Sequence, residues 1–570
     1  MFAAIPNFYK KARALLYGKR ARLLIGEAWP LLIVVSALTF ELSHIATSIW
    51  RQLLFYNSDS LTLPLIRQSL AHHEAFHWVF SSQFYLFPEG IIYAFCSLVT
   101  TSIRASLVLN AYINVVILYI LLRAVVWAIS KRDRVLQIIF SLGLCLLFIL
   151  YMVLERQPTA NALATYFLFT SYYYGVIMAG LAVLFASFLQ LNKPGLKTTS
   201  GFNKLLSVLV IIVSGLATFS DPLFIVQFAL PFLITLGLLY LINTVDFRRT
   251  LQVGAPQVVG VLLGFLSRGL LKDHIGESLG TYINVQAIPQ TLTTFHGAIS
   301  IALQSKSGKL EVTLITGVIL CALVSSLYLI HEQSKRTVHN KRLLLFCTTF
   351  GWISPAVLIF IVVLGGGQVR YLIPIALFPL VGLLCILESS ISIKQRRFWM
   401  SLMVVAALFI LALLIPSVKG ASKLVSSQGF SSTSCLADAL DNKPANGVGG
   451  YWDVRSIDVF ASDNETVLQA DSNFTIFPWL INLSSYQNKK FSFVIVDKPL
   501  FNVRSISPAD AAVLGQPTII HSCSSFFVYT YEPDSLGYRL LNNQIDTSLR
   551  KDLKLMNTGQ IAKYIMTTQV

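Results

Sequence analysis

Long apolar runs, each close to the length of a membrane-spanning helix, recur along most of the chain. A helix needs roughly 20 predominantly apolar residues to cross the hydrocarbon of a bilayer. The runs lie at about 29–50, 103–129, 135–154, 168–191, 204–219, 222–243, 252–271, 310–331, 343–364, 371–389 and 398–416. This pattern predicts a polytopic α-helical membrane protein with about eleven transmembrane helices.

The hydrophobic pattern changes after Pro416, beyond which no run is long enough to span. Short runs such as FSFVIVD at 491–497 and SSFFVYTY at 524–531 have the composition of strands and mix with helix-forming pieces. We therefore expect a small C-terminal extracytoplasmic α/β domain. The expected divisions are a cytoplasmic basic N-terminus at 1–28, a transmembrane domain at 29–416 with a first outer loop at 51–102, and the outer domain at 417–570.

Basic residues set the expected orientation. The net charge is +17, and Lys and Arg gather near 10–22, 131–134, 193–204, 248–249, 335–342 and 394–397, all on one side if the spans alternate. Such clusters mark cytoplasmic loops, so the charge does not indicate nucleic-acid binding. The apolar stretch at 87–101 would reverse every later loop if it crossed, so we expect an interfacial or re-entrant helix there. We expect a multi-pass protein of the plasma membrane.

Composition supports the membrane assignment and narrows the cysteine chemistry. The chain is 55% hydrophobic and 12% charged, whereas soluble domains carry about 25% charged residues. Five of the seven cysteines fall in apolar runs, where a thiol is usually a small packing group. Only Cys435 and Cys523 lie in a polar region, and a disulfide between them is expected if that region is outside the cytoplasm.

The polar loop at 56–90 carries the first candidate chemistry. It contains Asp59 and Glu89 between two apolar segments, and an Asp in mid-bilayer costs roughly 3 kcal/mol on the mildest scales. We expect both carboxylates to be catalytic. The alternatives are structural, because Asp59 could cap the following helix and Glu89 could favour a helix N-terminus through the dipole.

Further polar groups are expected at the same membrane face. They are Asp221 in a Ser-Asp-Pro turn, Arg268, Lys272 and His274 at the end of one span, and Arg370 after three glycines. Their convergence predicts a site. Each also has a simpler interpretation, since Asp221 fits a turn and the basic residues could extend to lipid headgroups.

Three other polar or aromatic clusters have weaker functional interpretations. His72, His73 and His77 with Glu74 have helical spacing that could bind a metal, although a solvated interfacial helix is the simpler interpretation. Tyr172, Tyr173 and Tyr174 fit an aromatic belt at the membrane interface. Glu41 and His44 lie one turn apart in the first span, which indicates a stripe facing a cavity.

The motifs in this order resemble the GT-C class of integral-membrane glycosyltransferases. They are a short basic N-terminus, one span, a loop that opens with Ser58-Asp59-Ser60-Leu61 and closes with Phe87-Pro88-Glu89, many further spans and an outer domain. SDPLF at 220–224, RYL-P at 370–374 and GYW at 450–452 resemble bacterial members. Glu89 stands where many relatives have Asp.

The resemblance implies transfer of a sugar from a polyprenyl-phosphate donor to a glycan, lipid or protein acceptor at the outer membrane face. Asp59 would be the general base, and attack opposite the phosphate would invert the anomeric configuration. Arg370, with Arg268 or Lys272, would bind the donor phosphate, and Asp221, His274 and Tyr371 would be available to bind substrate. Glu89 could orient the acceptor, tune Asp59 or help to hold a divalent metal, and no other cofactor is indicated.

Two other classes of protein remain open. A transporter or flippase for lipid-linked glycans would also have many spans and a cationic cavity, but such proteins usually show internal repeats or matching broken helices. The sequence shows neither. A membrane-anchored binding protein is the second alternative, although about three quarters of its chain would then serve only as an anchor.

Overall fold

A computed structural model of the protein describes residues 19–557. Segments within that range that are not described are 131–133, 157–162, 173, 192–199, 277–284, 332–340, 366–368, 391–392, 427–430, 442, 444, 461–464 and 499–504. Much of the predicted basic N-terminus and parts of the basic loops near 131, 193 and 335 therefore lie outside the described residues.

The described residues contain eight helices that are long and apolar enough to cross a membrane, or nine if one bent pair counts as a span. The expected number of eleven is therefore too high. The eight helices are α2 (Lys19–Thr47), α6 (Ile103–Ile129), α7 (Arg134–Leu154), α8 (Tyr174–Leu191), α9 (Ser200–Ser220), α11 (Phe247–Ser267) with the 3-10 helix η4 (Arg268–His274), α13 (Lys306–His331) and α14 (Lys341–Gly365). The bent pair is α16 (Ile393–Ala412) with α17 (Leu414–Ser426), whose axes differ by 50°.

Two predicted spans are shorter and irregular. The run at 222–243 forms a π-helical turn, η3 (Ile225–Ala229), followed by α10 (Leu230–Leu241). The run at 371–389 begins as a 3-10 helix, η8 (Val369–Ala376), that contains Pro374, and continues as α15 (Phe378–Ser390). Proline has no N–H for the helical ladder and its ring clashes with the preceding turn. Apolar length alone therefore overestimated the number of regular spanning helices.

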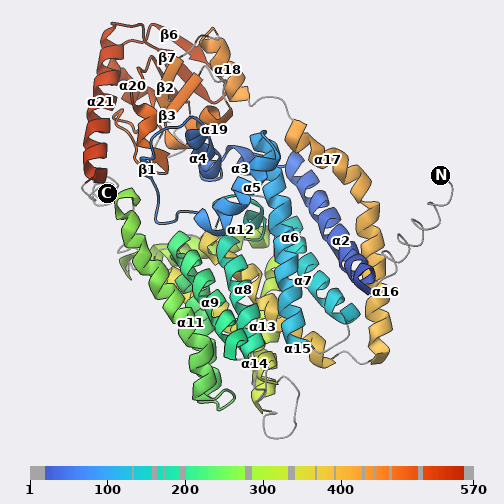
Figure 1. The fold of residues 1–570 in the computed structure, drawn as a ribbon. Coiled ribbons are helices and arrows are strands. Elements are labelled where there is room, and N and C mark those ends of the chain that lie inside the picture. The colour runs from blue at the N-terminus through green and yellow to red at the C-terminus, as the bar shows by residue number, and fades with distance from the viewer. Residues whose placement is uncertain are drawn as a thin grey trace, which may run out of the picture.

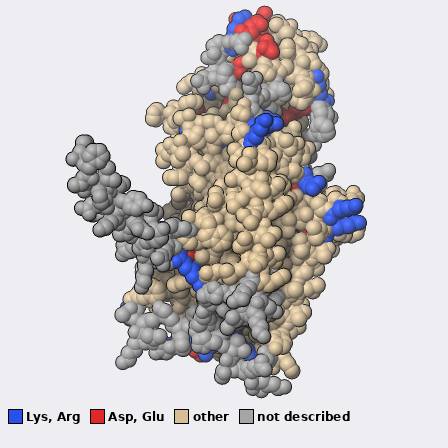
Figure 2. All heavy atoms as spheres, turned by 90° about the vertical axis from the view of Figure 1, so that its right-hand side faces the viewer, with Lys and Arg blue, Asp and Glu red and all other residues tan. Residues whose placement is uncertain are grey.

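The C-terminal α/β domain packs on one end of the helix bundle, which we call the domain end (Figure 1). Helices α7, α11 and α14 begin at the opposite end, and each begins at or next to a basic residue, namely Arg134, Arg248 and Lys341. Figure 2 shows one face on which the bundle surface is largely uncharged. Acidic side chains gather mainly over the domain, while basic ones lie over the domain and also at the side and the lower part of the bundle. This distribution fits a bundle surrounded by lipid below an aqueous domain.

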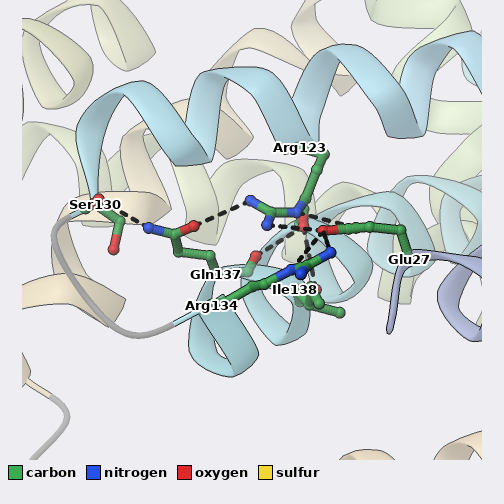
Figure 3. Close-up of polar contacts among 7 residues, drawn as sticks. Glu27, Arg123, Ser130, Arg134, Gln137 and Ile138 are labelled. Carbon is green, nitrogen blue, oxygen red and sulfur yellow. Dashed lines mark hydrogen bonds and ion pairs between the residues drawn. The ribbon is translucent and has the colours of Figure 1, made fainter. Parts of the chain in front are cut away.

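A partly exposed polar network joins α2, α6 and α7 at the end of the bundle opposite the domain (Figure 3). The Glu27 carboxylate of α2 accepts hydrogen bonds from Arg123 of α6, at 3.1 and 3.3 Å, and from Arg134 of α7, at 3.2 Å. Arg123 also donates to Gln137 Oε1 at 3.2 Å. A two-pronged guanidinium–carboxylate pair fixes both distance and orientation, so this network sets how α2 lies against α6 and α7.

Helices α9 and α11 approach closely because small residues line their contact. A Cβ on Gly260 would lie 2.6 Å from the carbonyl oxygen of Ile211, so only glycine fits there. Small residues let membrane helices approach at their backbones. The contact brings Ser220 at the end of α9 and Arg268 after α11 to the same domain end.

The C-terminal domain, which the sequence predicts to be outside the cytoplasm, is built on a mixed five-stranded sheet in the order β3-β2-β5-β7-β6. Strands β2 (Ala445–Gly449), β3 (Glu465–Gln469) and β5 (Phe493–Asp497) are parallel, while β7 (Phe526–Thr530) and β6 (Ile519–Ser522) continue it in antiparallel pairs. The strands predicted at 491–497 and 524–531 are confirmed as β5 and β7. Helices α18 (Ser431–Ala439), α19 (Tyr451–Phe460), α20 (Pro508–Ala511) and α21 (Leu536–Asn557) belong to this domain.

The first loop joins the bundle to the domain. It contains α3 (Trp50–Tyr56), α4 (Thr62–Ala71) and a short strand β1 (Trp78–Val79) that pairs with β4 (Ile481–Asn482) of the domain. On its other side, Phe80 N–H donates to the His274 carbonyl at 2.7 Å. The loop ends in η1 (Leu86–Gly90) and α5 (Ile91–Val99), a short apolar helix that is not among the spans.

Candidate functional site

Asp59 connects three distant parts of the chain at the domain end. Its Oδ2 accepts a hydrogen bond from Arg370 Nη1 at 3.0 Å, and its Oδ1 accepts one from the Tyr451 hydroxyl at 2.8 Å. Arg370 belongs to η8 and Tyr451 begins α19 of the outer domain. The structure thus brings the predicted pair Asp59 and Arg370 into contact, and the carboxylate does not cap α4, which has no side-chain cap.

The backbone around Asp59 is fixed by short polar side chains. Asn57 Oδ1 accepts hydrogen bonds from the Asp59 N–H at 2.9 Å and from the Tyr172 hydroxyl at 3.0 Å. Ser58 Oγ donates to the Tyr451 carbonyl at 2.8 Å. These contacts tie the loop to both the bundle and the domain, so the direction of the Asp59 carboxylate is set before any substrate binds.

A second guanidinium contacts Tyr451. Arg455 Nη1 donates to the Tyr451 hydroxyl oxygen at 3.4 Å, and its guanidinium carbon is 5.3 Å from the centre of the Tyr451 ring. Burial, with the nearby Asp59 charge, raises the pKa of Tyr451 well above its ordinary value. Tyr451 therefore stays a neutral phenol that donates to Asp59. In the cluster of Asp59, Tyr451, Arg370 and Arg455, the two arginines outnumber the one carboxylate, which leaves excess positive charge.

Glu89 and Asp221 form a separate buried acidic region. Glu89 is 1% exposed, its Oε1 accepts a hydrogen bond from Gly175 N–H at 2.9 Å, and a Cβ on Gly175 would lie 2.5 Å from that oxygen. Burial raises the pKa of Glu89 to about 8, and the Asp221 charge adds to this effect. Within the described chain, no hydrogen bond or ion pair joins Glu89 to Asp59.

Asp221 stabilises the turn in which it lies. Its Oδ1 accepts a hydrogen bond from the Leu223 N–H at 2.9 Å, which is the turn role considered from the sequence. The side chain is 4% exposed, and burial raises its pKa to about 7 even though Arg268 acts in the opposite direction. Burial therefore keeps Glu89 mostly protonated near neutral pH, whereas Asp221 is close to half protonated there.

The other predicted phosphate ligands, Arg268 and Lys272, and the predicted substrate-binding residue His274 lie away from Arg370 in their contacts. Arg268 is buried and donates to the backbone carbonyls of Phe219, at 2.7 Å, and Ser82. Lys272 is exposed on η4, and His274 Nδ1 lies 2.9 Å from the Trp78 carbonyl oxygen. Arg268 and His274 thus hold the first loop on the bundle.

Tyr371 lies next to the Asp59 cluster because it directly follows Arg370 in the chain. The guanidinium carbon of Arg370 is 5.9 Å from the Tyr371 ring centre, and the Tyr371 carbonyl accepts a hydrogen bond from Gln227 Nε2 at 2.7 Å. These contacts link η8 to the segment that follows the Ser-Asp-Pro turn. Tyr371 is half-buried and remains close enough to contact a group bound at Arg370.

The structure corrects the interpretation of the tyrosines and agrees with the simpler, solvated interpretation of the first-loop histidines. Tyr172 and Tyr174 are buried rather than placed in an aromatic belt, and Tyr173 lies outside the described residues. The first-loop histidines form no metal cluster among the described residues, since His72 and His73 are exposed and His77 contacts Ser484.

Glu41 of α2 does face inward, as its spacing with His44 indicated. It is buried, and His44 Nδ1 lies 3.7 Å from Glu41 Oε1. Glu155, at the end of α7, is also buried, and both its carboxylate oxygens accept backbone hydrogen bonds from the turn at 163–165. Burial raises the pKa of Glu155.

The predicted disulfide between Cys435 and Cys523 is confirmed, with Cα atoms 5.9 Å apart. It joins α18 to the β6–β7 connection. Disulfides persist in oxidising compartments, so the bond is consistent with an extracytoplasmic domain.

The side chains around Asp59 do not form a suitable divalent-metal site. Magnesium and calcium prefer several oxygen ligands with negative charge, whereas Asp59 has Arg370 and Tyr451 on its two oxygens. The set instead suits an anion. Sequence reasoning missed Arg455 and the contact made by Tyr451, although their i, i+4 spacing on a helix after Gly449-Gly450 placed them on one face.

No protein-family model matches the chain, and no curated protein matches it in sequence. The fold itself is that of a polytopic helical membrane protein with a C-terminal mixed α/β domain.

Proposed function

We propose that this protein is an inverting glycosyltransferase that moves a sugar from a polyprenyl-phosphate donor to an acceptor hydroxyl at the outer face of the plasma membrane. The observation that carries the proposal is the Asp59 carboxylate held at 3.0 Å from Arg370 and 2.8 Å from Tyr451, where the bundle meets the outer domain.

The charges of the cluster suit a lipid phosphate. A guanidinium has five donors in a planar fork and binds phosphate oxygens in pairs. Arg370 is partly exposed, with 27% of its side chain accessible, so it can take a phosphate oxygen while it remains beside Asp59. The polyprenyl tail would lie along the apolar surface of the bundle, where it does not have to displace water from polar groups.

In the proposed reaction, Asp59 accepts the proton of the acceptor hydroxyl as that oxygen forms a bond to the anomeric carbon. The bond from that carbon to the donor phosphate oxygen breaks, and its electron pair leaves with the polyprenyl phosphate. Arg370 stabilises the charge that develops on the leaving phosphate. Tyr451 orients Asp59, and Glu89 acts as a positioning residue for the loop.

A transporter or flippase of lipid-linked glycans is the alternative. The interrupted helices favour it, because η8 precedes α15 and the α16–α17 pair bends by 50°. Broken helices are common where transporters bind substrate. Translocation alone does not require a carboxylate held by an arginine and a tyrosine, as Asp59 is held by Arg370 and Tyr451. We therefore prefer the glycosyltransferase.

The deciding experiment uses the full chain in lipid nanodiscs with a panel of synthetic polyprenyl-phosphate hexoses and pentoses. Release of free polyprenyl phosphate is measured by mass spectrometry in the presence of extracts containing surface glycans. We expect release by the wild type and a loss of at least about a hundredfold with Asp59→Asn. The exposed ion-pair variant Asp441→Asn is the matched control and should retain activity.

Two results would count against the proposal. Asp59→Asn turnover close to that of the wild type would remove the base assignment. Movement of donors across the bilayer of liposomes, with no sugar transferred from any donor in the panel, would favour the flippase. Comparison of lipid-linked sugars and surface glycans from cells with and without the gene would then identify the cargo.

A further inference from the structure

A polar cavity of about 130 Å³ lies between the first loop and the outer domain. Helix α4 contributes one wall, and strands β3 and β4 contribute the other. Its polar lining includes Gln68, Glu74, Arg455, Asp458, Gln469 and Lys489. A cavity needs about 10–15 Å³ for each water-sized group, so this space holds about a dozen such groups, which is close to the size of one sugar ring.

The cavity adjoins the Asp59 cluster through a shared residue. Arg455 lines the cavity and also donates to the Tyr451 hydroxyl, which in turn donates to Asp59. The edge of the cavity is therefore two hydrogen bonds from the proposed base.

Two buried side chains in the cavity wall have polar atoms with no hydrogen-bond partner in the described part of the chain. Gln469 is 1% exposed and both its N–H groups donate to backbone carbonyls, of Phe477 at 2.6 Å and Trp479 at 2.7 Å, which leaves Oε1 as an unused acceptor. Arg455 is 3% exposed and its Nε is an unused donor. A buried polar atom without a partner is costly. Both atoms are enclosed by protein and do not face the open space of the cavity, so the case for a ligand rests on the other groups of the lining.

The remaining walls select among possible ligands. Three acidic residues, Glu74, Asp458 and Glu465, face two basic ones, Arg455 and Lys489, so the cavity does not favour an anion. Burial raises the pKa of Asp458 to about 6, while the Val467 N–H donates to its Oδ1 at 3.2 Å. Trp78, Val467 and Leu480 give an apolar side that matches the C–H face of a sugar.

We propose that this cavity binds one neutral sugar residue of the acceptor, which is therefore a glycan or a glycolipid. The inference rests on the proposed function, because it assigns the acceptor of the same reaction. The bound residue presents the hydroxyl of its neighbour, or its own outer hydroxyl, to Asp59. Asp458 of α19 and Gln68 of α4 hold the ring hydroxyls.

The test measures binding without transfer. The full chain in detergent is examined by saturation-transfer NMR with the methyl glycosides of glucose, galactose, mannose, N-acetylglucosamine and arabinose. We expect at least one glycoside to bind, with affinity reduced about tenfold by Asp458→Asn, which removes a hydrogen bond to a charged group. Gln68→Met, at a half-buried wall position, provides a second variant that removes the cavity amide together with its long 3.4 Å hydrogen bond to the Val459 carbonyl.

The matched control is Asp546→Asn on α21. It makes the same chemical change outside the cavity, in an ion pair with Lys490. It should bind like the wild type. Binding of no glycoside, binding unchanged by both cavity variants, or selective binding of a short unglycosylated peptide would each overturn the inference.

The two proposals fail in different ways. A protein that transfers sugar but binds no glycoside in this cavity would refute only the inference. Conversely, glycoside binding that depends on Asp458, in a protein that releases no polyprenyl phosphate, would refute the proposed transferase and leave the cavity as a sugar-binding site without an acceptor role.

Discussion

Replacing Glu89 by Gln should remove a large part of the pH dependence of the protein's stability. The Glu89 side chain is 1% exposed and its Oε1 accepts the Gly175 N–H at 2.9 Å. Gln keeps that acceptor and the same shape, but it cannot ionise. The variant therefore resembles the protonated wild type at every pH.

The magnitude follows from the pKa of this carboxyl group, which burial raises from 4.5 to about 8. Each pH step of 1 changes the free energy by roughly 1.4 kcal/mol when one state holds the proton and the other does not. Between about pH 4.5 and about pH 8, the folded protein keeps the proton and the unfolded chain has lost it. Stability is therefore full below about pH 4.5 and falls as pH rises through about 8, by a total of the order of 5 kcal/mol.

The measurement is thermal unfolding of the purified protein in detergent at several values between about pH 5 and about pH 8. We expect the wild type to lose stability relative to Glu89→Gln as the pH rises, with a remaining slope in both proteins from Asp221, whose pKa is about 7. Glu532→Gln, at an exposed position, is the control and should follow the wild type. Parallel pH profiles for the wild type and Glu89→Gln would show that Glu89 is ionised in the folded protein, contrary to the reasoning.

Three further predictions concern the donor site, the bundle and the outer domain. Arg370→Ala should weaken binding of a polyprenyl-phosphate sugar by at least about tenfold, since a hydrogen bond to a charged group is worth roughly 1.5–3 kcal/mol; unchanged donor affinity would remove Arg370 from the phosphate site. Glu27→Gln should lower the free energy of unfolding by about 1 kcal/mol, a modest value because the pair with Arg134 is partly exposed, and a full loss of folded protein or no change in thermal unfolding would contradict this. Cys435 and Cys523 should react with a membrane-impermeant maleimide on intact cells only after reduction, whereas labelling without reductant would show free thiols and labelling only after permeabilisation would place the domain inside.

The residues around Asp59 show how much of the site the sequence pattern could predict. Asp59 and Arg370 were expected at one membrane face because spans alternate in direction, and the structure adds that they touch. Arg268 was expected beside them as a phosphate ligand, yet it donates to the Phe219 carbonyl and holds the first loop. Sequence places a residue on a face of the membrane, but only the packing of several elements determines whether its side chain meets a neighbour or a backbone carbonyl.

The amino-acid sequence by itself determined the class of fold, because burying apolar runs in lipid and leaving polar segments in water depends on composition and length alone. It also indicated the disulfide between Cys435 and Cys523 and the strands β5 and β7, whose signals are local. Tertiary structure decided the number of regular spans, since Pro374 and the π-helical turn at Ile225–Ala229 interrupt helices that apolar length predicted. It also decided that Tyr451 of the outer domain completes the Asp59 cluster, because a hydrogen bond between residues 392 positions apart depends on how two separately folded parts pack together.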